Sequence, residues 1–134
     1  MAYEFLEHTA DVRLRVTGRT LGELFSEALA GLMELLRPGA ATGPEVRRPV
    51  SLSASDATAL LVDFLGRVLL DAHTRRERYD GLAMLKLTET RIEAELVGAT
   101  VAGFGDDVKA VTYHEADVRR TADGGWETVI VLDV

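Results

Sequence analysis

The spacing of hydrophobic residues changes at Gly18 from every second position to helical spacing, and this change most constrains the fold. Residues 11–17 alternate apolar and polar side chains, which is typical of a half-buried strand. Beyond Gly18, apolar residues recur at helical spacing, and Thr20 with Glu23 forms a capping-box pattern, so we predict a helix over residues 20–37. A strand followed at once by an amphipathic helix must pack the two apolar faces together.

A second strand and a second helix follow the first pair. The Gly, Ala, Thr and Pro content of residues 39–45 predicts a loop, after which residues 50–54 alternate as a strand. Pro49 at the start of this strand favours an edge position in a sheet. Either Ser55 or Asp56 can cap the second helix. The apolar face of that helix consists of Ala57, Leu60, Leu61, Phe64, Leu65 and Val68.

The remainder of the chain is strand-like. Turn residues, among them Asp-Gly and Gly-Gly dipeptides that favour hairpins, separate segments at 82–88, 91–97, 109–120 and 126–134. The order strand, helix, strand, helix and several mainly antiparallel strands predicts an α+β fold, with two helices packed on a mainly antiparallel sheet or a partly closed barrel. The length of 134 residues fits a single domain spanning 1–134.

Composition and charge exclude several classes of site. Cysteine is absent, which excludes thiol nucleophiles, thiolate zinc sites and disulfides. The net charge of −7 disfavours binding of free nucleic acid, DNA included. The segment Met1–Phe5 has no basic residue, and charges interrupt the apolar stretch 60–70. We therefore expect a cytoplasmic protein without a secretory signal or a membrane segment.

The first polar cluster, residues 7–11, directly precedes the first predicted strand. His8 is a candidate general base or metal ligand, and Asp11 is a candidate carboxylate ligand. Alternatively, Thr9 and Asp11 cap a turn through hydrogen bonds to the backbone. The spacing alone leaves both interpretations open.

The second polar cluster lies in the third strand-like segment and contains Lys109, Tyr113 and His114. Strand alternation places Lys109, Val111 and Tyr113 on one face and His114 on the other. Such residues so close together are unusual for packing alone, which favours a functional segment. The alternative is that Tyr113 covers the edge of the core and His114 is solvated.

The third polar feature is the end of the sequence. Asp133 interrupts the apolar pattern of the last predicted strand, and Val134 follows with main-chain and terminal oxygens. Two side-chain carboxylates with these oxygens form a hard, oxygen-rich set that suits Ca²⁺ or Mg²⁺. Because the chain has 22 acidic residues, the pair Asp11 and Asp133 is not specific on its own.

Three further features are better explained by a structural role than by catalysis or ligand binding. Asp63 and Arg67 lie four residues apart opposite the apolar face of the second predicted helix, which predicts a surface ion pair. The segment 103–105 lacks the third glycine of a dinucleotide-binding loop. The basic run 73–78 favours a helix C-terminus, with contact to RNA or to an acidic partner as the alternative.

Three segments taken together resemble the archease family. Residues 8–12, His-Thr-Ala-Asp-Val, are similar to the N-terminal signature of that family, and residues 18–25 match its Gly and Glu-Leu-Phe run. Residues 108–114, Val-Lys-Ala-Val-Thr-Tyr-His, are similar to its most specific segment. The chain also closes, as family members do, with Asp133 and an aliphatic residue. Residues 102–108 depart from the family because this linker is short and lacks the usual Gly-Glu-Pro-like start, so no contacts of that loop are carried over.

This resemblance implies a function and a partner. Archeases are small accessory proteins, not enzymes, of the RtcB-type RNA-splicing ligase, which joins tRNA halves with GTP and Mn²⁺. They promote guanylylation of the ligase, allow it to turn over many times and broaden its nucleotide use. The implied partner is therefore an RtcB-type RNA ligase, and tRNA is reached only through that ligase.

The resemblance also implies a metal site. The family binds a divalent cation, commonly Ca²⁺, and the implied ligands here are Asp11, Asp133 and Val134, with Mg²⁺ or Mn²⁺ as other candidates. We expect this site to face the ligase active centre together with His8, Lys109, Tyr113 and His114.

Two other classes of function remain open. A metal-dependent phosphoesterase would use Asp11 and Asp133 with His8 or His114 as the base, and would turn over a phosphoester without a partner. A general chaperone or adaptor for RNA-processing proteins would instead suppress the aggregation of its clients independently of Asp11.

Overall fold

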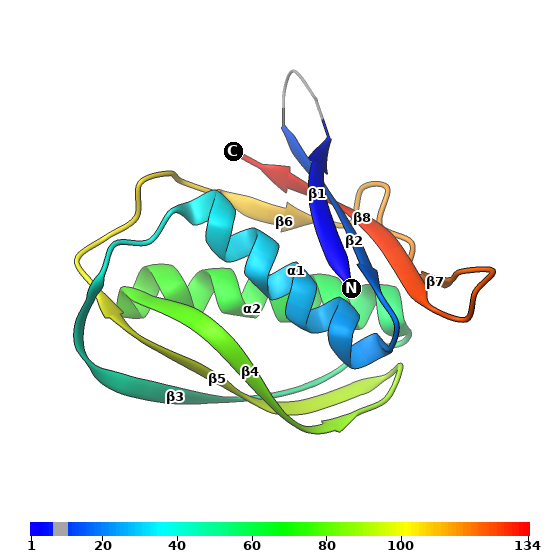
Figure 1. Ribbon diagram of the computed structural model, residues 1–134, viewed down its shortest axis with the longest axis horizontal. Helices are drawn as coiled ribbons and strands as arrows, with labels where there is room; N and C mark the ends of the chain where they lie inside the picture. The colour runs from blue at the N-terminus through cyan, green and yellow to red at the C-terminus, as the bar shows by residue number, and fades with distance from the viewer. Residues whose placement is uncertain (7–10) are drawn as a thin grey trace.

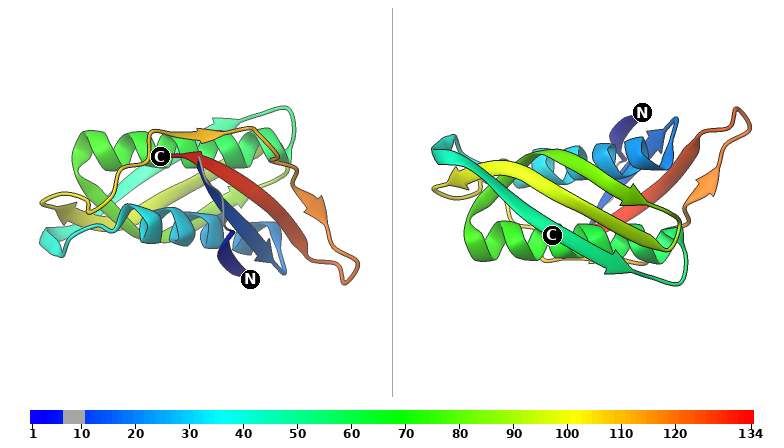
Figure 2. Two further views of the ribbon diagram at one scale, coloured as in Figure 1. Left: turned by 90° about the horizontal axis from the view of Figure 1, so that it is seen from above. Right: turned by 90° about the horizontal axis from the view of Figure 1, so that it is seen from below.

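The computed structural model describes residues 1–6 and 11–134 and has three layers (Figure 1). Two helices form the middle layer, and an antiparallel sheet covers each side of them (Figure 2). The helices are α1 (Leu21–Leu36) and α2 (Ala57–Arg75). The strands are β1 (Ala2–Leu6), β2 (Val12–Gly18), β3 (Ala41–Ser53), β4 (Glu77–Leu87), β5 (Arg91–Val101), β6 (Ala110–Thr112), β7 (Arg119–Arg120) and β8 (Trp126–Asp133).

The first sheet has the order β1-β2-β8-β6, and β7 pairs with the start of β8. All of its strand pairs are antiparallel. The inward side chains of its two central strands are fully buried: Leu14, Val16, Ile130 and Leu132. The strand predicted for residues 11–17 is therefore confirmed as β2, with polar side chains on the opposite, outward face.

The second sheet has the order β3-β5-β4 and packs on the other side of the helices. β3 is an edge strand, as Pro49 predicts. The prediction of a loop over residues 39–45 is wrong, because β3 begins at Ala41. The pairing of β3 with β5 is irregular between Ala41 and Glu45. This bulge at the sheet edge accommodates Pro44, whose missing N–H would interrupt a regular ladder.

Both helices begin at predicted caps. The Thr20 hydroxyl accepts a hydrogen bond from the Glu23 N–H at 3.1 Å, and the Asp56 carboxylate caps α2 in the same way at 2.8 Å. Phe25 of α1 and Phe64 of α2 join the two helices, with ring centroids 5.4 Å apart. The two helices therefore share one core with the inward faces of both sheets.

The ion pair predicted between Asp63 and Arg67 is replaced by another pair within α2 and by one tertiary hydrogen bond. Arg67 binds Asp71 at 3.2 Å, one helical turn further on, and Asp63 accepts a hydrogen bond from Tyr113. Either pair has the spacing of four residues that brings side chains together on a helix. The Tyr113 contact decides between them, and it joins α2 to the segment after β6.

The single strand predicted for residues 109–120 is wrong. The chain forms β6, turns at residues 113–116 and pairs again only as β7. Glu115 has a left-handed φ of 61°, which ends the extended conformation. The α+β class and the antiparallel pairing are confirmed, with the strands divided between two sheets. Among the described residues, neither helix is long and apolar enough to cross a membrane.

Candidate functional site

The start of β2 and the end of β8 meet at one corner of the first sheet (Figure 1). Val12 and Leu132 are the last pair of the β2–β8 ladder, so the next residues, Asp11 and Asp133, follow where this ladder ends. The Asp133 carbonyl also accepts a hydrogen bond from the Lys109 N–H at 2.7 Å. The fold thus brings three of the predicted site residues to this corner, which we call the carboxylate corner.

The carboxylate corner offers oxygen ligands of graded exposure. Asp133 and Val134 are exposed, whereas Asp11 is half-buried. The described residues place no group of three or more His, Asp or Glu side chains where they could hold a metal ion. A cation at this corner would therefore rely on Asp11, Asp133 and the oxygens of Val134, with water or a partner supplying further ligands. Carboxylate and carbonyl oxygens suit Ca²⁺ or Mg²⁺, so the donor set fits a hard cation.

Two predictions concern residues outside the described part of the chain. His8 lies in the segment 7–10, and so does Thr9. The role of His8 as a base or ligand, and the alternative turn cap by Thr9, therefore stay predictions.

Tyr113 is fixed against α2. Its hydroxyl donates a hydrogen bond to the Asp63 carboxylate, although its side chain remains 56% exposed. This hydrogen bond to Asp63, which stabilises the protonated phenol, raises the pKa of Tyr113. Val111 packs against the core beside the same helix, which agrees with the predicted shared face of Val111 and Tyr113.

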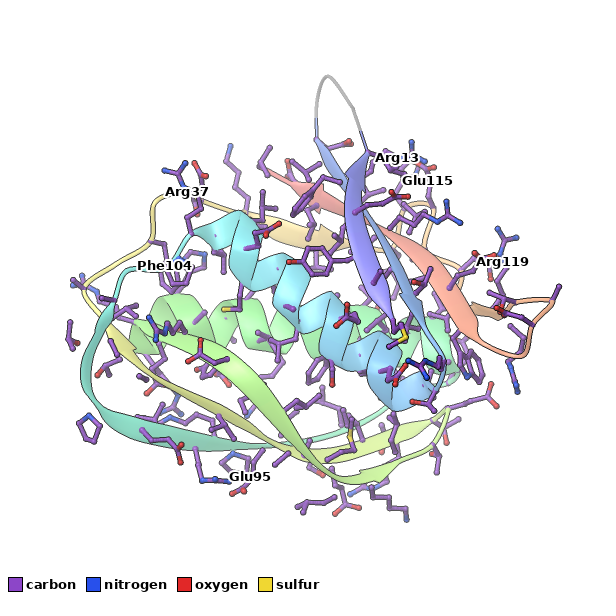
Figure 3. All side chains as sticks on the ribbon, in the orientation of Figure 1. Arg13, Arg37, Glu95, Phe104, Glu115 and Arg119 are labelled. Atoms are coloured by element: carbon purple, nitrogen blue, oxygen red, sulfur yellow. The ribbon has the colours of Figure 1, made fainter. Side chains whose placement is uncertain are left out.

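Glu115 anchors the turn at residues 113–116 to β2. Its carboxylate pairs with the Arg13 guanidinium at 2.7 Å, and the two side chains lie together on the outward face of the first sheet (Figure 3). Arg13 lies two residues after Asp11 in the sequence. His114 is exposed, with its Nε2 atom 3.8 Å from the Glu115 carboxylate. The turn that carries Tyr113 and His114 is therefore held by α2 at Tyr113 and by β2 at Glu115.

Sequence reasoning missed Arg13, Glu115 and Asp63 as parts of this arrangement. Arg13 carries a weak signal, because it is a charged residue on the polar face of a predicted strand. The partner of Arg13 lies 102 residues away along the chain, so no local spacing could indicate the pair. For Asp63 the sequence predicted the wrong partner. Arg67 lies four residues away on the same helix, whereas the observed partner, Tyr113, lies 50 residues away.

An apolar recess of about 350 Å³ adjoins the carboxylate corner. The Arg37 guanidinium and the Asp106 carboxylate pair across its polar side at 3.2 Å. The residues that line this recess are Phe5, Leu6, Asp11, Val12, Glu34, Leu35, Arg37 and Asp106. A partner's side chain that enters this recess would lie beside Asp11.

The sequence matches the archease protein family over residues 3–134. It is 30% identical to the protein archease of Methanosarcina acetivorans over 145 aligned residues, which cover 98% of this chain and 95% of that protein. It is 32% identical to the protein archease of Methanopyrus kandleri, and this alignment covers all of both chains.

Two solved structures share the fold. The solution structure of Methanobacterium thermoautotrophicum protein 1598 superimposes with a TM-score of 0.74 at 22% identity, covering 99% of each chain. The crystal structure of a Thermotoga maritima protein described as an archease and possible chaperone superimposes with a TM-score of 0.73 at 22% identity, covering 96% of this chain and 94% of that one.

Proposed function

The chain belongs to the archease family, and from this membership we propose that it is a non-catalytic activator of an RtcB-type RNA ligase. In this role it promotes guanylylation of the ligase, lets the ligase turn over many times and broadens its nucleotide use. The observation that carries the proposal is the family match over residues 3–134, which includes all three segments that resemble archease motifs.

The carboxylate corner is the surface that we propose to face the ligase active centre. Asp11 and Asp133 follow the last pair of the β2–β8 ladder, and the turn that carries Tyr113 and His114 is anchored to α2 and to β2. Lys109 contributes an exposed cation next to Asp133. The net charge of −7 would also steer this protein toward a basic, RNA-binding partner.

We propose that a divalent cation, most simply Ca²⁺, is held by Asp11, Asp133 and the oxygens of Val134. When bound, this cation supplies local positive charge and open coordination positions for a partner's oxygen atoms. The protein's own contribution is geometric: β2 and β8 fix the two carboxylates, while α2 and β2 hold the turn that carries Tyr113 and His114.

The test is multiple-turnover RNA joining by a limiting amount of RtcB-type ligase with GTP and Mn²⁺. We expect this protein to raise turnover and Asp11→Asn to lower that stimulation at least about tenfold. Asp80→Asn is the matched control, because Asp80 is an exposed carboxylate on β4 of the other sheet. Full stimulation by the Asp11 variant would refute the role of the carboxylate corner, and no stimulation by the parent protein would refute the proposed function.

Cation binding is tested separately by calorimetric titration of the protein alone with Ca²⁺. We expect Asp11→Asn and Asp133→Asn each to weaken binding roughly tenfold or more, and Asp80→Asn to leave it unchanged. Equal affinity in all four proteins would remove the cation from the proposal while leaving ligase activation to be judged by the joining assay.

A second candidate function is a chaperone or adaptor for RNA-processing proteins, which is favoured by the description of the Thermotoga maritima relative as a possible chaperone. This function predicts that the parent protein and the Asp11→Asn variant suppress the aggregation of a client protein to the same extent. Light scattering of a heated client protein with each variant distinguishes this function from ligase activation.

A further inference from the structure

An open groove lies at the other end of the β2–β8 pair, about 20 Å along β2 from the carboxylate corner. It has a volume of about 880 Å³ and lies between the β2–α1 turn and the β7–β8 hairpin. This hairpin projects from the rest of the ribbon (Figures 1 and 2). Its walls are formed by Met1, by residues 17–19 and by residues 121–126. We call this hollow the hairpin groove.

Trp126 and Arg120 form a flat cationic platform at the hairpin groove. Trp126 is the only tryptophan of the chain and is half-buried. The Arg120 guanidinium lies over its ring, with Cζ 4.7 Å from the ring centroid. Arg120 also donates to the Gly124 carbonyl at 2.9 Å, which fixes the guanidinium in place. Because Arg120 is exposed, its outer face is open to a further planar group.

Arg19 supplies a second cation at the hairpin groove. Among the described residues, four arginines make no ion pair with a carboxylate: Arg19, Arg75, Arg76 and Arg120. Arg75 and Arg76 lie at the C-terminal end of α2, where the helix dipole stabilises positive charge. Arg19 and Arg120 instead belong to the hairpin groove and its rim. The Nε atom of Arg19 has a Met1 sulfur at 2.7 Å, which is a weak acceptor and leaves the charge uncompensated.

The acidic groups beside the hairpin groove are engaged in local structure. Asp123 accepts hydrogen bonds from the Thr121 hydroxyl and from the Gly125 N–H, and the bond from Thr121 lowers the pKa of Asp123. The Glu23 carboxylate accepts the Arg19 N–H at 2.9 Å within the cap of α1. Hydrogen bonding does not remove the charge of either carboxylate, so an anionic ligand would bind on the guanidinium side of the groove, near Arg19 and Arg120.

We propose that the hairpin groove binds one nucleotide of a single-stranded RNA, with its base stacked on Arg120 and Trp126 and its phosphodiester beside Arg19. Aromatic rings and arginine planes are the surfaces on which unpaired bases stack. A duplex hides these base faces. One guanidinium matches the single charge of a phosphodiester better than the several charges of a free nucleoside triphosphate, and the net charge of −7 limits contact to a short segment.

This inference extends the proposed function, in which RNA is reached only through the ligase. The choice of RNA over single-stranded DNA rests on that function, whereas the stacking platform and the cation come from the groove itself. The experiment below uses the protein without a ligase, so a negative result would leave ligase activation intact. Loss of ligase activation would equally leave the groove binding unaffected.

The test follows Trp126 fluorescence and, independently, the anisotropy of a dye-labelled single-stranded RNA hexamer. We expect saturable fluorescence quenching and a rise in anisotropy, with log Kd depending on log salt with a slope of roughly 0.7, as expected for one phosphate contact. Arg19→Gln and Arg120→Gln should each weaken binding roughly fivefold. Trp126→Phe, which keeps an apolar ring, should weaken it less. Lys86→Gln is the matched control, because Lys86 is exposed on β4 and its substitution removes the same single positive charge.

Several outcomes would overturn the proposal. Absence of any anisotropy change would show that the protein does not bind the RNA. An equal loss of affinity in the Lys86 and Arg19 variants would show that binding depends only on nonspecific electrostatic attraction. Equal binding of duplex RNA would exclude base stacking. Quenching by GTP at concentrations below those needed for the hexamer would assign the groove to free nucleotides instead of RNA.

Discussion

The two sheets of this protein differ in where their outward carboxylates lie. On the outward face of the second sheet, where Figure 3 labels Glu95, Arg47 pairs with Glu95 at 3.3 Å. Arg91 pairs with Glu93 at 3.2 Å on the same sheet. On the first sheet, the carboxylates of Asp11 and Asp133 gather at one corner. The first sheet also has outward ion pairs, such as Arg13–Glu115 and Arg15–Glu127, so the sheets differ in the two aspartates that the first sheet gathers at one end.

The buried faces of the two sheets differ as well. Arg48 of β3 forms a bidentate pair with Glu77 of β4, at 2.6 and 2.9 Å, and the Tyr79 hydroxyl donates to the same carboxylate at 2.9 Å. Glu77 is only 1% exposed, so this cluster ties the two edge strands of the second sheet together from within. We therefore call the second sheet the scaffold, and we call the first sheet, which carries the candidate site, the working surface.

The largest loss of stability is expected in the scaffold, from a substitution of Gly98 in the central strand β5. A Cβ atom there would lie 1.8 Å from the Arg78 carbonyl oxygen, a backbone atom that cannot move without breaking the β4–β5 ladder. We expect Gly98→Ala to destabilise the protein by at least about 4 kcal/mol in urea unfolding.

Gly31 of α1 gives the matched control beneath the first sheet. A Cβ atom there would meet a Leu14 methyl group at 2.7 Å, and a side chain can yield where a backbone cannot. Because alanine also gains up to about 1 kcal/mol of helix propensity, Gly31→Ala should cost only about 1 kcal/mol. Equal losses in the two variants would contradict the division into scaffold and working surface.

The next largest effect concerns Glu77. We expect Glu77→Ala to cost about 3 kcal/mol, because it leaves Arg48 and Tyr79 without their shared acceptor. The hydrogen bond from Arg48 lowers the pKa of Glu77 below its ordinary value of 4.5. A carboxylate with a lowered pKa in the folded state stabilises the fold above pH 4.5, and this stabilisation is lost as the pH falls through the lower folded value.

Acid titration followed by circular dichroism measures this contribution. The parent protein should lose stability progressively below about pH 4.5, and Glu77→Ala should show a smaller further loss over the same range. Ligase stimulation at neutral pH should persist wherever this variant is folded. An acid sensitivity that is unchanged by the substitution would place the responsible carboxylate elsewhere.

A smaller effect on stability, but a larger one on activity, is expected at Glu115. The Arg13–Glu115 pair is partly exposed, so Glu115→Gln should change the free energy of unfolding by less than about 1 kcal/mol. The turn that carries Tyr113 and His114 loses its anchor on β2, and stimulation of the ligase should fall several-fold. Arg13→Gln should match it, and the double variant should lose no more than either single one. Additive losses would show that the two side chains act separately.

The smallest effect is expected at Arg47, on the outward face of the second sheet. Its pairs with Glu45 and Glu95 are exposed, so Arg47→Gln should leave thermal stability within about 0.5 kcal/mol and ligase stimulation unchanged. A loss of stimulation in the joining assay would mean that the second sheet also contacts the partner.

Local patterns predicted the elements whose structure depends on local interactions. The capping box at Thr20 and Glu23 and the alternation of residues 11–17 correspond directly to α1 and β2. β1 alternates only briefly, with Tyr3 and Phe5 on one face and Glu4 on the other, and it pairs along its whole length with β2. The early start of β3 was missed for a related reason, since pairing with β5 overrides the turn preference of Pro44.

The candidate site was predictable by residue type but not by arrangement. Asp11, Lys109 and Asp133 were singled out from the sequence, and the ladder brings their backbones together. Asp63 and Glu115, which hold the turn in place, have partners 50 and 102 residues away. Contacts of such long range depend on how the layers stack, and no spacing within the sequence encodes them.

The order of the strands along the chain has a consequence for synthesis. The second sheet and both helices come from one continuous stretch, whereas β2 must wait for β8, which is synthesised after the other strands of the first sheet. The second sheet and both helices can thus fold before β8 is available to complete the first sheet. A nascent or prematurely terminated chain has no carboxylate corner, so only a finished molecule can engage a partner there.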